Sequence, residues 1–384
     1  MFSESYRGIR VVDLATNVAG PLAAMIMGDM GADVIKVERG PLGDDTRQLS
    51  PVHKGASTVY LSVNRNKRSV LLDFKNADDL ERIKRLVAGA DVLIDSFPPG
   101  VAAKLGLEFE QTKVLNHSIV HCSISAFGDG KTGRTKPGYD ALVQAYSGLM
   151  SFTGEASGPA VRIAPSTLDI STGMWSAMAI MAAIRNREHG SGAQHIRPSL
   201  IDSAFMMMCH QVAGFTATGE DPVKYGSGAP SAVPYRVYKA SDGEFMLATS
   251  TDAQFLRLSE ALSAPKMAAE SRFSGMAARI AHRDELDQLL EEIFERESVQ
   301  FWLARLEYHK IPAGPVHSLS EALETNVVRE RELFLKPQDL AWEDGLPLVR
   351  SPLDVNGTGW FRPPPLLGEH TAEVLAELEK NNAV

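Results

Sequence analysis

Residues 8–38 read GIRVVDLATNVAGPLAAMIMGDMGADVIKVE, and this stretch decides the fold. The β-branched runs at 8–15 and 33–38 predict two strands. Between them, residues 22–31 are predicted to form a helix after a tight turn, with Pro21 at its first position, where proline is favoured. A strand, tight turn, helix and strand within about 30 residues form a βαβ unit, which implies a parallel sheet.

The same alternation of elements continues as far as residue 125 and predicts an open α/β sheet. We predict strands over 69–73, 91–95 and 118–125, and helices over 77–88, 168–187 and 198–217. A Gly/Pro/Ser-rich loop at 225–234 then leads to a predicted β-hairpin over 235–248 and to charged helices over 252–308. This change in composition and in the pattern of elements indicates a second lobe.

The composition is that of an ordinary globular protein with 384 residues, enough for two lobes. A net charge of −9 without a long basic run argues against nucleic-acid binding. The two cysteines, Cys122 and Cys209, form no C-x-x-C pair, so we expect a reduced, cytoplasmic location and no metal site. We also expect no signal peptide in residues 1–7 and no transmembrane helix.

Two nucleotide-binding motifs are incomplete. The first βα turn, at 15–21, is not G-x-G-x-x-G, although Glu38 stands where a ribose-binding acid would, so a nicotinamide enzyme is disfavoured. The Gly130-Lys-Thr132 segment matches the end of a Walker A loop, but Ser125 occupies the position of its first glycine. We interpret that segment as a surface turn.

Asp169 begins a predicted apolar helix, downstream of Gly138-Tyr139-Asp140. A carboxylate at a helix N-terminus is stabilised in its ionised form and is able to attack a carbonyl. Aspartate is also a favoured N-cap residue, as are Ser166 and Thr167, so a purely capping role is the alternative. His195 and the other histidines lack ligand spacing, and we interpret them as surface or hydrogen-bonded residues.

Several sequence blocks resemble the class III CoA-transferases, the CaiB/BaiF family. The resemblance runs nearly end to end, and the order of the blocks is more specific than any one of them. The blocks are Gly8–Leu14, Ala19–Pro21, Met30–Glu38, Asn64–Ser69, Gly138–Asp140, Gly148–Glu155, Pro234–Gly243 and Leu366–Thr371.

The resemblance implies an α/β fold with a Rossmann-like large domain and a smaller α+β domain. The large domain is expected from residues 1–200 and 325–384, and the small domain from residues 222–309. Two connectors would turn the subunit into an open ring, and two such rings would interlock as a homodimer.

The resemblance also implies an acyl-CoA:carboxylate CoA-transferase in which Asp169 is the covalent nucleophile. CoA would move between small organic, possibly dicarboxylic, acids through an aspartyl anhydride and an aspartyl thioester. Tyr139 and Asp140 would orient the acyl group or the nucleophile, and Gly226 and Gly228 would be a short counterpart of the family's glycine-rich lid. CoA is then a substrate and product, and no tightly bound cofactor is expected.

By matched position, CoA contacts are expected from segments that follow the strands and from a lysine beyond them. They are Val18, Ala19, Arg39, Leu72, Asp73, Phe74, Lys75, Ser96, Phe97, Pro98 and Lys104. The cations Arg39, Lys75 and Lys104 suit a phosphate-rich ligand. Pro98 and Lys104 stand where many members have arginine. Pro98 lacks the positive charge, and Lys104 keeps the charge but lacks the bidentate guanidinium group. Val18 occupies a position that is glutamine in oxalate-using relatives, so formyl-CoA:oxalate transfer is not expected.

Two alternatives remain. α-Methylacyl-CoA racemases share the fold and an aspartate near Asp169, but they carry a histidine base where this chain has Tyr139. A phenol with a pKa of about 10 is a poor base at neutral pH, which favours transfer. The second alternative is a CoA-binding protein without catalysis, and the presence of Asp169 and Asp140 argues against it.

Overall fold

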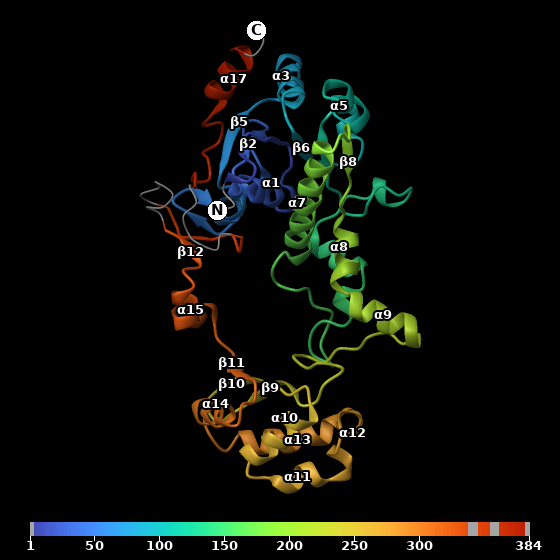
Figure 1. The fold of residues 1–384 in the computed structure, drawn as a ribbon, viewed down its shortest axis with the longest axis vertical. Helices are drawn as coiled ribbons and strands as arrows, with labels where there is room; N and C mark the ends of the chain where they lie inside the picture. The colour runs from blue at the N-terminus through green and yellow to red at the C-terminus, as the bar shows by residue number, and fades with distance from the viewer. Residues whose placement is uncertain (1–3, 337–344, 354–360, 381–384) are drawn as a thin grey trace. The chain divides into compact units, whose positions relative to one another are not determined.

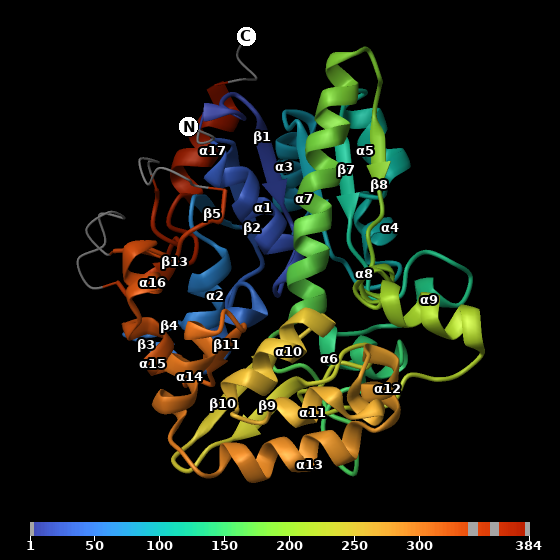
Figure 2. The ribbon, with the colours of Figure 1, turned by 60° about the horizontal axis from the view of Figure 1, so that its bottom comes forward.

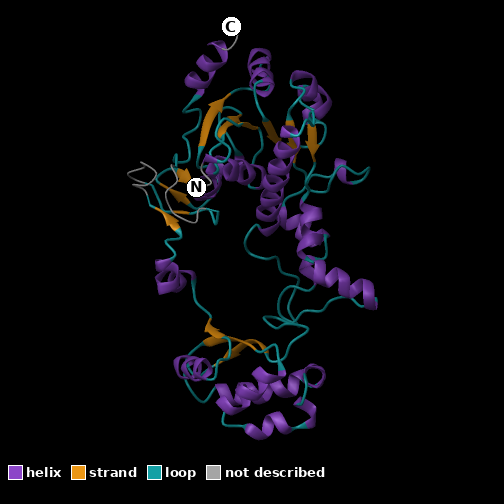
Figure 3. Cartoon of the chain, in the orientation of Figure 1, coloured by secondary structure: helices purple, strands orange, loops and turns teal. Residues whose placement is uncertain are grey.

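The computed structural model describes residues 4–336, 345–353 and 361–380. The chain divides into two compact units, each of which contains both strands and helices (Figure 3). The first unit comprises Met1–Leu149, Arg162–Thr218 and Glu332–Val384, and the second comprises Met150–Val161 and Gly219–Arg331. The first unit is therefore built from both ends of the chain.

A six-stranded parallel sheet forms the centre of the first unit, in the order β5-β2-β1-β6-β7-β8. Its strands are β1 (Arg10–Asp13), β2 (Asp33–Glu38), β5 (Lys67–Leu71), β6 (Val92–Asp95), β7 (Val120–Ser123) and β8 (Gln194–Ile196). The strand order reverses at β1, where Val11 lies opposite both Val34 and Val92. In open α/β sheets, ligands bind outside the carboxyl ends of the strands at such a reversal.

The described helices of the first unit lie on both faces of this sheet and beyond it. They are α1 (Ala19–Asp29), α2 (Thr58–Val63), α3 (Ala77–Ala88), α4 (Val101–Leu105), α5 (Phe109–Leu115), α6 (Asp140–Tyr146), α7 (Thr167–Glu188), α8 (Leu200–Met207), α9 (Cys209–Thr218) and α17 (Thr371–Lys380). Helix α1 packs against α7, and α3 contacts α5 and α17 (Figure 1). A Cβ at Gly173 of α7 would lie 2.7 Å from the carbonyl oxygen of Ala19, so glycine permits the close approach of α1 and α7.

Most predicted elements are confirmed, β2 and α3 to the residue. Two predictions were wrong in detail. Helix α1 begins at Ala19, so Pro21 is its third residue. A backbone N–H at this position has no hydrogen-bond partner within the helix, so proline, which lacks the N–H, breaks no helical bond there. The helix predicted over 198–217 is two helices, α8 and α9, because the backbone leaves the helical conformation at the buried Met208.

Helix α7 bears on the expectation that the chain has no transmembrane helix, because its length and composition would allow it to span a membrane. Among the residues that the structure describes, it is the one helix that is long and apolar enough, with 22 residues. It also contacts α1, α6, α8, β7 and β8, as the core helix of a folded unit does (Figure 2). Length and composition are weak evidence for a membrane span in a helix with such contacts.

The end of the chain is held against the edge strand β5. The Ser69 carbonyl accepts a hydrogen bond from the His370 backbone N–H at 2.9 Å, and the Leu71 N–H donates to Thr371 Oγ1 at 3.0 Å. Arg68 of β5 forms ion pairs with Glu373 and Glu377 of α17 at 2.9 and 2.7 Å. The Leu366–Thr371 block therefore completes the first unit.

The first unit also contains two small hairpins, β3 (Val52–His53) with β4 (Ala56–Ser57) and β12 (Phe334–Leu335) with β13 (Leu348–Val349). The second unit pairs a three-stranded antiparallel sheet, ordered β11-β10-β9, with a helical layer. Its elements are β9 (Tyr235–Lys239), β10 (Glu244–Ala248), α10 (Asp252–Ala261), α11 (Pro265–Ala269), α12 (Met276–Ala281), α13 (Arg283–Phe294), α14 (Val299–Tyr308), β11 (Ala313–Pro315), α15 (Leu319–Glu324) and α16 (Asn326–Glu330). Its core centres on Phe245, Phe294 and Trp302.

Candidate functional site

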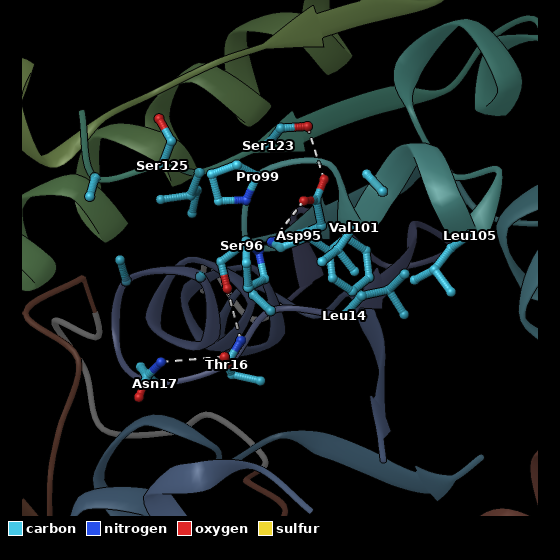
Figure 4. A pocket seen from close by; sticks show the side chains of 18 of the residues that line it. Leu14, Thr16, Asn17, Asp95, Ser96, Pro99, Val101, Leu105, Ser123 and Ser125 are labelled. Atoms are coloured by element: carbon cyan, nitrogen blue, oxygen red, sulfur yellow. Dashed lines mark hydrogen bonds between the residues drawn. The ribbon is translucent and has the colours of Figure 1, made fainter. Parts of the chain in front are cut away.

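A cavity of about 1070 Å³ opens in the first unit at the carboxyl ends of the parallel strands. Loops that follow β1, β2, β6 and β7 line it, and Figure 4 shows Thr16, Asn17, Ser96 and Ser125 from three of these loops. The cavity therefore lies where an open α/β sheet is expected to bind a ligand, and it is large enough for a cofactor-sized molecule.

Most of the predicted site residues line this cavity. They are Ala19, Arg39, Asp73, Phe74, Lys75, Ser96, Phe97, Pro98, Lys104, Tyr139 and Asp169. Three others do not: Leu72 is 3% exposed and packs in the core, Val18 is the N-cap residue of α1, and Asp140 is buried beside α7. Gly226 and Gly228 belong to the second unit, so their place in the site stays a prediction.

The first βα turn is held by side chains instead of the glycines of a dinucleotide-binding turn. The Thr16 N–H donates to Ser96 Oγ at 3.0 Å (Figure 4). The Asn17 N–H donates to Asp44 at 3.2 Å. Asn17 has a φ of 67°, in the left-handed region that asparagine tolerates better than most residues. This turn therefore presents a different surface to a ligand from that of G-x-G-x-x-G.

Buried ion pairs lie directly beneath this turn. Lys36 Nζ contacts Asp44 at 2.8 Å and the Ala15 carbonyl oxygen at 2.9 Å, with both charged side chains inaccessible to solvent. Burial opposes ionisation of Asp44, but Lys36 and Thr46 outweigh it and lower the pKa of this carboxyl. Glu38 is bound by Arg47 at 2.7 Å, so this acid is not free for a ribose.

Asp169 is the third residue of α7, and its side chain lines the cavity. The N-cap residue is Ser166, and the Asp169 carboxylate makes no hydrogen bond or ion pair with any residue that the structure describes, so the capping alternative is wrong. Burial, followed by the charge of Asp140, raises the pKa of Asp169 to about 7. Burial and the neighbouring anion therefore oppose the stabilisation of the ionised form that a helix N-terminus provides.

A second polar network lines the cavity, and sequence reasoning missed it. Buried Asp95 contacts His121 Nε2 at 2.7 Å and accepts from Ser123 Oγ at 2.9 Å, and His195 Nε2 lies 3.1 Å from Ser123 Oγ. His195 stacks on Phe109 at 4.7 Å, and burial and His121 lower its pKa to about 4. The signal for this network was that Asp95 ends the strand predicted over 91–95 and that Ser123 lies near the end of the strand predicted over 118–125.

Seven lysine and arginine residues line the same cavity, and sequence analysis predicted three of them as site residues. The additional ones are Lys36, Arg134, Lys136 and Arg197. Arg39 is paired with Asp45 at 2.7 Å, and Arg197 with Asp129, whereas Lys136 Nζ lies 4.5 Å from the centre of the Tyr146 ring. Nine acidic residues line the cavity as well. The cations that form no ion pair with any described residue, Lys75, Lys104, Arg134 and Lys136, are the ones available to an anionic ligand. In the described part of the chain, no group of three or more His, Cys, Asp or Glu residues could hold a metal ion.

Comparisons with known proteins agree with this geometry. The sequence model of CoA-transferase family III matches residues 6–371. The chain is 37% identical to a succinate–glutarate CoA-transferase of Agrobacterium fabrum, over 97% of this chain and 95% of that protein. It is 33% identical to the succinyl-CoA:glutarate CoA-transferase of Homo sapiens, over 97% and 85%. A crystal structure of a CaiB/BaiF family protein from Brucella suis superposes with a TM-score of 0.85 and 34% identity, over 97% and 98% of the two chains.

Proposed function

The chain belongs to CoA-transferase family III, and from that premise we propose that it transfers CoA between small dicarboxylic acids through a covalent intermediate on Asp169. The single observation that carries this proposal is the Asp169 carboxylate, which lines the cavity without a hydrogen-bond or ion-pair partner among the described residues. An acid at the wall of a ligand cavity with no partner of its own is available to a substrate.

The covalent route conserves the energy of the thioester. The Asp169 carboxylate attacks the donor thioester, and the C–S bond breaks to give a mixed anhydride and CoA thiolate. The thiolate attacks the aspartyl carbonyl and releases the donor acid, which leaves an aspartyl-CoA thioester. The acceptor carboxylate attacks this thioester and expels the thiolate. The thiolate then takes the new acyl group from the second anhydride, which restores Asp169.

The acids are proposed from the names of relatives. One relative is a succinate–glutarate CoA-transferase, and another, 33% identical over 96% of this chain, is the succinyl-CoA:mesaconate CoA-transferase of Haloarcula marismortui. All three acids in these names are dicarboxylic and short. The cations of the cavity that form no ion pair with a described residue suit a substrate whose second carboxylate remains ionised during transfer.

The test is intact-protein mass spectrometry after incubation with succinyl-CoA, glutaryl-CoA and acetyl-CoA. The proposal expects a CoA-sized adduct that hydroxylamine removes, mapped to Asp169 after borohydride reduction. The absence of an adduct, with transfer proceeding, would overturn the covalent route. Deuterium entering the α-carbon from solvent without exchange of acids would point to racemase chemistry instead.

The proposed CoA site uses the cations of the cavity, with Arg39, Lys75 and Lys104 facing the phosphates. Replacing Lys104 with glutamine is expected to raise the KM for the acyl-CoA about 3- to 10-fold with little change in kcat, because a phosphate contact binds ground and transition states alike. Steady-state kinetics check this. Lys113→Gln, on α5 outside the cavity, is the matched control. An unchanged KM for Lys104→Gln would remove this residue from the CoA site.

The pH dependence of kcat/KM should report the ionisation of the Asp169 carboxyl. Only the ionised carboxylate attacks, and its pKa is raised to about 7, so kcat/KM is expected to fall as the pH drops through 7. Well below that pH the fall approaches tenfold per unit. Dephospho-CoA thioesters should give the same profile, which excludes titration of the 3′-phosphate of the substrate. A flat profile between pH 5.5 and 8.5 would contradict the assignment.

We further propose a cytoplasmic homodimer of interlocked subunits that needs no tightly bound cofactor. Large apolar side chains on α7, α8 and α9 of the first unit support association. They are Trp175 (43% exposed), Met178 (44%), Phe205 (50%), Met206 (54%), Met207 (42%) and Phe215 (48%). Monomers rarely leave apolar side chains exposed in such numbers on neighbouring helices. Sedimentation equilibrium tests the proposal, and a monomer at micromolar concentration would overturn it.

A further inference from the structure

Helix α7 is capped from outside its own chain segment. Its N-cap residue, Ser166, makes no capping hydrogen bond with its side chain. Instead, Asp140 Oδ2 accepts from the backbone N–H groups of Leu168 at 2.8 Å and Asp169 at 3.2 Å. Asp140 belongs to α6 and is 5% exposed. Of the two expected roles of Asp140, orienting the acyl group or the nucleophile, these bonds favour the second, because they bind the backbone of the nucleophile itself.

A second residue of α6 fixes the other end of this segment. Gln144 Nε2 donates to Asp140 Oδ1 at 2.5 Å and to the Ile163 carbonyl oxygen at 3.4 Å. Gln144 Oε1 accepts from the Ile163 N–H at 2.8 Å. Gln144 is 0% exposed, so water does not replace these contacts. The two side chains together hold the backbone at both ends of the stretch from Ile163 to Asp169.

We infer that Asp140 and Gln144 are positioning residues, which fix the Asp169 carboxylate at the cavity wall by holding the entry of α7. The inference rests on the proposed nucleophilic role of Asp169. It has a mechanical reason, because the segment that enters α7 arrives from the second unit at Arg162 and begins with the breaker-rich Ala164-Pro-Ser. Without the hydrogen bonds of Asp140 and Gln144, that loop alone would determine where the first turn of α7 lies. A buried hydrogen-bond network of this kind specifies one geometry.

The two residues act differently on the charge of the nucleophile. Asp140 is a neighbouring anion and contributes to the raised pKa of Asp169, after burial, whereas Gln144 is neutral. The other elements packed against α7 contribute Asp29 on α1, paired with Arg65; Asp202 on α8, bonded to Ser199; and His121 on β7 and His195 on β8, which contact Asp95 and Ser123. The difference in charge between Asp140 and Gln144 provides a readout, the acid limb of the pH profile, that a purely structural role would not change.

The experiment compares Gln144→Leu and Asp140→Asn with the wild-type enzyme. Gln144→Leu is expected to lower kcat about 10- to 100-fold, the cost of a misplaced reacting group, with the KM for acyl-CoA and the acid limb of the pH profile unchanged. Asp140→Asn keeps the size and one acceptor but removes the charge, so its acid limb is expected to move to lower pH. Gln111→Leu, on exposed α5, is the matched control and should retain the wild-type rate.

The outcomes separate this inference from the proposed function. If the wild-type enzyme forms no adduct at Asp169, the proposed function fails. If it forms one and Gln144→Leu forms it at the wild-type rate, or if Asp140→Asn keeps the acid limb in place, the inference alone fails. Thermal unfolding and CoA binding establish that each variant is folded. If Gln144→Leu does not fold, the more conservative Asp140→Asn carries the test.

Discussion

Replacing Asp169 with asparagine is expected to lower kcat for CoA transfer from succinyl-CoA to glutarate by at least about 10³-fold. The amide has almost the same size, but it is not a nucleophile toward a thioester, so neither anhydride forms. Chromatographic separation of the acyl-CoA products measures the rate. Asp169→Ala should lose as much activity, which excludes slow deamidation as a source of residual turnover. Asp78→Asn is the matched control and should keep the wild-type rate, because Asp78 is an exposed residue of α3 outside the cavity.

The stability of Asp169→Asn provides an internal control. A carboxyl whose pKa rises to about 7 on folding destabilises the ionised native state, and its stabilising contribution is lost as the pH rises from the unfolded value through 7. Asparagine avoids this cost of about 1–3 kcal/mol, so the thermal midpoint should rise by roughly 2–6 °C at pH 8 and by less as the pH falls toward 4. An inactive but more stable variant is not misfolded. Turnover at the wild-type rate by both Asp169→Asn and Asp169→Ala would contradict the assignment of Asp169 as the nucleophile.

Sequence periodicity was sufficient where one pattern dominates. The strand at Asp33–Glu38 and the helix at Ala77–Ala88 were predicted to the residue because the first is a continuous β-favouring run and the second has one apolar face. The segment 198–217 is predominantly apolar and has no proline after Pro198, so its pattern contained no sign of the break at Met208. Periodicity identifies an element better than it locates its interruptions.

The candidate site was predictable in part. Asp169 could be located because a single acid opens a long helix. The CoA contacts that line the cavity were predicted by their positions, matched to those of the CaiB/BaiF family. The role of Asp140 depends on the packing of α6 against α7, which no local pattern encodes. The same holds for His195, whose partner Ser123 lies on the neighbouring strand. Hydrogen bonds between distant segments are the part of a site that one sequence leaves undetermined.

Replacing Lys67 with methionine is expected to be the most destabilising single change beneath the site. Lys67 Nζ contacts Asp13 at 2.9 Å and the oxygens of Pro21 and Asn64 at 2.8 Å each, so all three of its donors are used. Its side chain is 0% exposed. Burial lowers its pKa to about 8, although Asp13 opposes that shift, so the side chain still carries its charge at pH 7. Methionine would leave the Asp13 carboxylate buried beside Lys36 alone, at 3.8 Å.

Removing one partner of a buried ion pair costs about 3–5 kcal/mol, because the other charge stays desolvated. Hydrogen exchange measures this cost within the first unit: the amides of β1 and β5 should exchange at least about 100-fold faster in Lys67→Met. Adding Asp13→Asn should recover part of the loss, since the double variant no longer buries an unpaired charge. Lys113→Met, on the surface of α5, should leave these amides unchanged. Slow exchange in Lys67→Met would mean that Lys36 alone neutralises Asp13, and that the turn beneath the cavity does not depend on Lys67.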